Sequence, residues 1–118
     1  AGACEAVVGA LQSHAGYAEV AKGACGAAHN LASNEATRTR LGDAGACEAV
    51  LGALQAHTGH AGVIARACYA VVGLTYLSEA NSERLGNVGA CEAVVGVLRA
   101  HAGQAVMVEQ ACAAVRIL

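Results

Sequence analysis

The chain has 118 residues and a mass of 11.6 kDa, which is the size of one domain. Hydrophobic residues make up 56% and charged residues 14%, so the chain is too apolar to remain disordered. A net charge of −2 disfavours a nucleic-acid partner or an anionic membrane surface, because both require a basic patch. The start of the chain resembles no signal peptide, and no stretch is apolar enough to span a membrane. Because the chain does not begin with Met, we expect it to be a processed piece or part of a longer protein.

An internal repeat organises the sequence. The hexapeptide GACEAV begins at Gly2, Gly45 and Gly89, at offsets of 43 and 44 residues. In each unit a second cysteine follows the first by 21 residues, giving the pairs Cys4 and Cys25, Cys47 and Cys68, and Cys91 and Cys112. A fixed period of roughly 20–50 residues is typical of solenoids and other repeat arrays.

The segment that follows each GACEAV start predicts a helix. In the second unit its apolar side chains recur at i, i+3, i+4 and i+7, at Cys47, Val50, Leu51 and Leu54. Glu48 in the first turn and His57 at the end suit the helix dipole. One glycine recurs in the middle of this helix, as Gly9, Gly52 and Gly96. Since glycine weakens a helix, its recurrence suggests that helices approach closely there.

A longer helix is predicted next, after a break at Thr58-Gly59. Its inward face in the second unit comprises Ile64, Ala67, Cys68, Val71 and Leu74. The equivalent face in the first unit comprises Val20, Ala24, Cys25, Ala28 and Leu31.

A short helix completes the unit. Asn34 and Ser78 are typical N-cap residues, and the leucines expected to face inward are Leu41 and Leu85. We expect the glycines that end the short helices to be Gly42 and Gly86. Because alanine is abundant and strand alternation is absent, the predicted fold class is all-α.

The three-helix unit resembles the armadillo repeat, the family of β-catenin, importin-α and the vacuolar armadillo proteins. Residues 24–32 resemble its third helix, residues 34–41 its first and residues 45–54 its second. The rival HEAT repeat has two helices and commonly a proline, which this chain lacks. The resemblance implies a right-handed α-solenoid of about 2.7 repeats.

In this interpretation residues 1–118 form one armadillo-like domain. It comprises a partial repeat over 1–44 that starts at the second helix, a repeat over 45–88 and a partial repeat over 89–118.

The resemblance also implies a function, because armadillo third helices form a concave wall that binds extended peptides. In the family an asparagine ladder and neighbouring aromatic residues line this wall. The ladder position here is occupied by Asn30, Gly73 and Ile117, and the aromatic position by Gly26, Tyr69 and Ala113. We expect a protein or extended peptide to bind a stripe made of Lys22, Asn30, Arg66, Tyr69, Gly73 and Tyr76. The alternative is an ordinary solvated helix face.

The cysteines and histidines have structural interpretations as well as functional ones. The cysteines lack the C-x-x-C spacing of zinc and redox sites, so we expect buried free thiols and a reducing compartment, cytosol or nucleus. The histidines that end the second helices are His14, His57 and His101. A metal ladder or a pH sensor is one interpretation, and the favourable helix-dipole position is the one we prefer. We expect no metal and no cofactor.

No catalytic motif is present in the sequence. Glu5, Glu48 and Glu92 recur as first-turn helix residues, so we do not expect them to act as catalytic acids or bases. We therefore expect a non-enzymatic protein-interaction module. The alternative is a structural spacer that stacks head to tail through apolar ends, formed by Ala3, Val7, Val8, Val115, Ile117 and Leu118.

Overall fold

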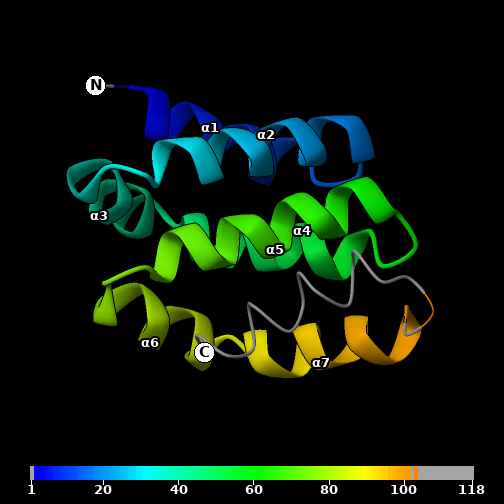
Figure 1. Ribbon diagram of the computed structural model, residues 1–118. Helices are drawn as coiled ribbons and strands as arrows, with labels where there is room; N and C mark the ends of the chain where they lie inside the picture. Colours follow the sequence, from blue (N-terminus) through cyan, green and yellow to red (C-terminus); the bar gives the residue numbers. More distant parts are fainter. Residues whose placement is uncertain (1, 102, 104–118) are drawn as a thin grey trace.

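The computed structural model describes residues 2–101 and 103, and within these ranges it contains seven α-helices and no strand (Figure 1). The predicted all-α class is therefore confirmed. The helices are α1 (Ala3–Ser13), α2 (Ala18–Leu31), α3 (Glu35–Ala44), α4 (Ala46–Ala56), α5 (Ala61–Thr75), α6 (Glu79–Asn87) and α7 (Ala90–Ala100).

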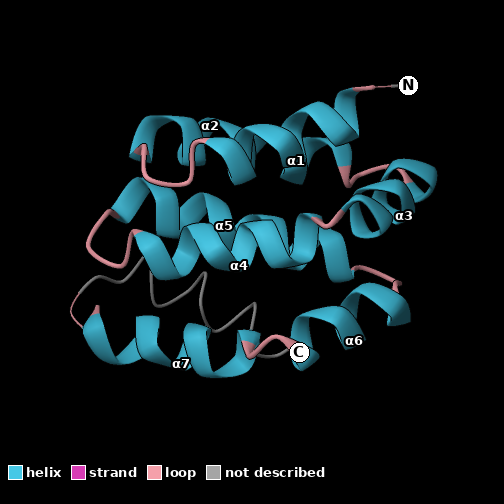
Figure 2. Ribbon diagram, turned by 180° about the vertical axis from the view of Figure 1, so that it is seen from behind, coloured by secondary structure: helices cyan, strands magenta, loops and turns pink. Residues whose placement is uncertain are grey.

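Helices at equivalent positions of the sequence repeat lie against one another. The long helices α2 and α5 pack together, α4 lies between α1 and α7, and α3 contacts α6 (Figures 1 and 2). Within each unit α1 packs on α2 and α4 packs on α5. The short helices α3 and α6 lie on the same side of the stack (Figure 1).

The predicted inward faces of the second unit form the core. In α4 the stripe Cys47, Val50, Leu51 and Leu54 is buried, and in α5 every residue of the predicted stripe is buried. In the first unit Ala24, Cys25 and Ala28 are buried, whereas Val20 and Leu31 are half-buried. Fully burying a Val, Leu or Ile side chain stabilises the fold by about 1.5–3 kcal/mol. Alanine and cysteine supply much of the remaining core, so the helices interlock through small side chains.

The predicted N-caps of the short helices are confirmed. The Asn34 side-chain oxygen accepts hydrogen bonds from the amides of Ala36 and Thr37, at 2.9 and 3.3 Å. The Ser78 hydroxyl accepts one from the amide of Asn81 at 3.2 Å.

The predicted C-cap glycines are wrong. Gly42 and Gly86 lie inside α3 and α6, whereas the left-handed glycines are Gly45 and Gly89, with φ of +98° and +84°. These are the first residues of GACEAV, and they turn the chain into α4 and α7. A left-handed turn there suits glycine because it has no Cβ atom.

Gly42 is required for a different reason, which is close packing between units. A methyl group on Gly42 would collide with the side chains of Asn81 and Arg84. The Asn81 amide nitrogen donates to the carbonyls of Leu74 and Arg38, at 2.8 and 3.2 Å, and its oxygen accepts from Arg84 at 3.0 Å.

Arg84 extends this network to the preceding unit. Its second terminal nitrogen forms an ion pair with Asp43 at 2.8 Å. We call the set Gly42, Asp43, Asn81 and Arg84 the Asn81 clamp, since it joins α3 to α6.

The close approach expected at Gly9, Gly52 and Gly96 is also wrong. Among the described residues no side chain or neighbouring helix comes within 4 Å of a methyl group placed on any of them. The reason is that the buried stripe lies on the other side of these helices. Close contacts between units occur instead at Gly26, Gly42, Gly62 and Gly73.

The N-terminal end exposes less apolar surface than the sequence predicted. Val8 is buried in the core, Val7 is half-buried and Ala3 is exposed. The other three residues proposed for the ends, Val115, Ile117 and Leu118, lie outside the described residues. No helix in the described part of the chain is long and apolar enough to cross a membrane.

A pair of equivalent glycines tests the clamp. We expect Gly42→Ala to lower the free energy of unfolding by about 2 kcal/mol, because the methyl group displaces Asn81 and leaves buried polar groups without partners. Gly86→Ala is the matched control, since no neighbouring atom lies within 4 Å of its added methyl group. That change should stabilise α6 by about 0.5–1 kcal/mol. Urea denaturation measures both, and equal effects would contradict the clamp.

Candidate functional site

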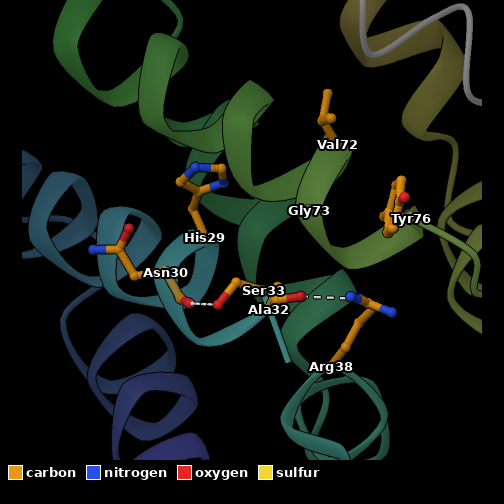
Figure 3. Close-up of a pocket in the computed structure, with 8 residues that line it drawn as sticks. All are labelled: His29, Asn30, Ala32, Ser33, Arg38, Val72, Gly73 and Tyr76. Atoms are coloured by element: carbon orange, nitrogen blue, oxygen red, sulfur yellow. Dashed lines mark hydrogen bonds between the residues drawn. The ribbon is translucent and has the colours of Figure 1, made fainter. Parts of the chain in front are cut away.

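Two adjoining hollows lie along the boundary of α2 and α5. The larger has a volume of about 370 Å³ and lies where both helices end, with α3 alongside (Figure 3). Its lining residues are His29, Asn30, Ala32, Ser33, Arg38, Val72, Gly73 and Tyr76. The smaller, of about 280 Å³, is lined by Gly26, His29, Asn30, Arg66 and Tyr69. Because His29 and Asn30 line both, we treat the two hollows as one feature, the α2–α5 groove.

Five of the six predicted binding residues line this groove. They are Asn30, Arg66, Tyr69, Gly73 and Tyr76. The sixth, Lys22, lines neither hollow. Lys22 lies on α2 one turn before Gly26. A methyl group on Gly62 of α5 would come within 3.2 Å of the Lys22 side chain.

The two tyrosines of the groove are accessible. Tyr69 is 42% exposed and Tyr76 is 59% exposed, although both are large and partly apolar. Leu77 follows with 85% exposure and a left-handed φ of +49°. Such a backbone conformation costs a residue with a side chain about 1–2 kcal/mol. Strained residues of this kind cluster at functional sites, and nothing in the sequence pattern indicated this one.

His29 ties the two walls of the groove together. One ring nitrogen makes a 3.1 Å hydrogen bond with the backbone carbonyl of Tyr69, and the two rings lie 5.4 Å apart between centroids. Gly73 gives this contact room, because a methyl group there would lie 3.3 Å from the His29 ring and from Ala32, closer than ordinary van der Waals contact. The glycine at the ladder position therefore serves helix packing.

The Arg66 side chain reaches from α5 across the groove to Gly26 of α2. A methyl group on Gly26 would lie 2.8 Å from a terminal nitrogen of Arg66, so this guanidinium rests against the backbone of α2. The small residue at the aromatic position thus leaves room for a cation from the neighbouring unit.

Arg38 is a groove residue that the sequence analysis missed. It is only 6% exposed, its Nε donates to the carbonyl of Ala32 at 2.9 Å, and its guanidinium lies 5.3 Å from the centre of the Tyr76 ring (Figure 3). A cation at that distance is attracted by the aromatic face. One signal was available, because Arg38 precedes the inward-facing Leu41 by three residues and so shares its helix face.

The groove carries positive charge and no carboxylate. Arg38 and Arg66 line it, whereas no Asp or Glu lines either hollow. In the described part of the chain the ion pair lies outside the groove, between Arg84 and Asp43. No group of three or more His, Cys, Asp or Glu side chains within residues 2–101 could hold a metal ion. The arrangement suits binding of a ligand with apolar parts and hydrogen-bond acceptors.

The described cysteines are free thiols, four of them buried and Cys91 half-buried. Burial raises the pKa of Cys25 to about 12, with a further rise from nearby Cys68, and burial raises the pKa of Cys68 to about 11. Burial also raises the pKa of Cys47 to about 11, the nearby Glu48 charge adding to the effect. Thiols held protonated in this way are weak nucleophiles, so they act as small core residues. Cys112 lies outside the described residues.

Two of the recurring histidines link successive units. His57 and His101 end α4 and α7, and their Nε2 atoms form 2.7 Å hydrogen bonds with the carbonyls of Ala15 and Thr58. Those carbonyls belong to the loops of the preceding unit. Because a carbonyl only accepts, each Nε2 must carry its proton. The recurrence therefore has a structural explanation in unit-to-unit contact, which the sequence analysis missed.

No protein-family model, curated protein or solved structure matches the chain.

The buried thiols predict a pH dependence of stability. Their pKa values in the folded chain exceed the ordinary value of 9.0, so the unfolded chain releases protons that the folded chain retains. Their contribution is complete below pH 9 and should decline by about 1 kcal/mol per thiol by pH 10. Urea denaturation from pH 7 to 10 measures the decline. Cys25→Ala should make it shallower, and an unchanged slope in that variant would contradict the assignment.

Proposed function

We propose that the chain is a non-enzymatic protein-interaction module that binds an extended peptide in the α2–α5 groove. The observation that carries the proposal is that five predicted binding residues line one groove, although Asn30 lies on α2 and the other four lie on α5 or directly after it. The finer fold assignment is part of the same proposal. Stacking of like helices with a period of 43–44 residues supports an armadillo-like α-solenoid.

The residue types in the groove favour protein binding. Tyrosine and arginine are enriched among interface residues that dominate binding energy, because they combine large contact area with directed hydrogen bonds. Tyr69 and Tyr76 offer exposed rings, and the exposed Asn30 amide can both donate to and accept from a peptide backbone. The rigid floor formed by His29 and Gly73 reduces the ordering cost of binding.

A second candidate function is a structural spacer in a longer stack of units. The inter-unit hydrogen bonds of His57 and His101 favour it, since the equivalent His14 is exposed on α1, the first helix of the described stack. In this case the repeats set length, and contacts would form end to end.

The free thiols support a proposal for the compartment. We place the protein in a reducing compartment, cytosol or nucleus, because buried thiols persist unpaired there.

A display library of random peptides tests the binding proposal even though the natural partner is unidentified. We expect panning on the purified chain to enrich peptides that the double variant Asn30→Ala, Tyr69→Ala no longer binds. The reason is that both side chains border the same hollow. Tyr17→Ala is the matched control, because Tyr17 is 66% exposed and lines neither hollow of the groove.

Circular dichroism should show equal helicity in all three proteins. Peptides that bind the double variant as well as the unmutated chain would contradict the groove. If no peptide is enriched while light scattering shows mass growing with concentration, the spacer becomes the better account.

A further inference from the structure

Arg38 is an unusual residue to bury. Removing a guanidinium from water costs several kcal/mol unless hydrogen bonds and an opposite charge compensate it. Within the described residues one backbone carbonyl, that of Ala32, and the Tyr76 ring are its observed partners. The ion pair in this part of the chain involves Arg84 instead. Within residues 2–101, Arg38 therefore has no carboxylate of the kind that usually accompanies a buried arginine.

The terminal nitrogens of Arg38 open onto the larger hollow. Its Nε is occupied by Ala32, and no buried side-chain nitrogen or oxygen among the described residues lacks a partner. The terminal N–H groups are therefore not shut inside the protein, and the hollow that Arg38 lines is where they can be reached. Figure 3 shows Arg38 at one end of this hollow, with Tyr76 and Ser33 nearby and the Asn30 side chain directed away from it.

The neighbours of Arg38 suit an anion of modest size. The single proton of the Ser33 hydroxyl at the rim is donated to the carbonyl of Asn30 at 2.9 Å, so Arg38 is the donor left for an anion. Tyr76 covers one side of the guanidinium and restricts its orientation. Because no Asp or Glu lines the hollow, nothing within the lining competes with an incoming carboxylate.

We propose that this hollow binds a Glu or Asp side chain of the peptide that occupies the α2–α5 groove. The inference rests on the proposed function and specifies its ligand as an acidic peptide. The planar guanidinium matches a carboxylate through two parallel N–H···O bonds, and partial burial strengthens such a pair. Arg66 in the adjoining hollow adds a second cation to the same groove, which disfavours basic peptides.

The peptides enriched from the display library provide the first readout. We expect them to share an acidic residue at one position. The tightest-binding peptide with Glu at that position is then synthesised with both termini blocked, together with a version that carries Gln there. Fluorescence anisotropy gives the dissociation constants of the two peptides. The loss of one charge-assisted pair should weaken binding by roughly tenfold to a hundredfold.

A variant of the chain then identifies the partner of that carboxylate without removing Arg38. Ser33→Asp places a carboxylate at the rim of the hollow, where it can pair with Arg38, and Ser33→Asn is the uncharged control of nearly equal size. Because Ser33 is exposed, neither change should disturb folding. We expect Ser33→Asp to weaken the Glu peptide by about tenfold or more and to abolish the difference between the Glu and Gln peptides. Ser33→Asn should preserve that difference.

Three outcomes overturn the inference. Groove-dependent peptides with no shared acidic residue would leave the proposed function standing and remove the carboxylate site. A Glu-to-Gln difference that persists in Ser33→Asp would place the carboxylate elsewhere. Binding that requires a free C-terminal carboxylate would assign the hollow to chain ends rather than to side chains. Failure to enrich any groove-dependent peptide would instead refute the proposed function itself.

Discussion

The buried side-chain amide of Asn81 joins α3, α5 and α6 beside the larger hollow of the α2–α5 groove. One nitrogen bonds both the carbonyl of Arg38 in α3 and the carbonyl of Leu74 in α5. Arg38 carries the guanidinium of the larger hollow, and Leu74 lies two residues before Tyr76. The same contact that joins two units thus links the backbone that carries the cation to the end of α5, next to the aromatic ring. It requires Gly42, because only a residue without a side chain lets Asn81 lie so close to α3.

Small residues at the α2–α5 boundary serve packing where a family resemblance would place ligand contacts. Gly73 occupies the expected ladder position, and its missing side chain lets His29 reach the carbonyl of Tyr69. Gly26 occupies the expected aromatic position and receives the guanidinium of Arg66. The groove therefore presents fewer asparagine and aromatic contacts than the resemblance implies, and two arginines, Arg38 and Arg66, line it. This difference is the reason for proposing an acidic peptide.

Helix positions, N-caps and buried faces could be predicted from the sequence because they depend on local spacing. Asn34 and Ser78 precede their helices as expected, and the predicted stripes of α4 and α5 are buried. Contacts between units could not be predicted in this way. Thr37 and Asn81 occupy equivalent positions of the repeat. Thr37 donates to the carbonyl of Leu31 at the end of α2, and Asn81 donates to that of Leu74 near the end of α5. Asn81 also donates to the carbonyl of Arg38 in the neighbouring unit, a contact that spacing within one unit does not indicate.

The same limit explains the errors. Gly42 and Gly45 both resemble helix-ending glycines, and in both units the helix runs past the first glycine, whereas the second adopts the left-handed conformation. The site residues Asn30, Tyr69 and Tyr76 were found because they share one face of the predicted helices. Arg38 was missed because it comes from α3 and reaches the groove only through the stacking of helices.

The central claim is that ligand binding occurs between α2 and α5, and an NMR titration tests it most directly. The chain, labelled with ¹⁵N, is titrated with a peptide enriched by panning, and the amide signals and the Arg38 Nε–H signal are followed. The account predicts that the largest shifts fall on groove residues, such as Gly26, Asn30 and Tyr69, together with the Arg38 side chain. Shifts confined to α1 and α7 would contradict it, because they would place binding at the ends of the stack.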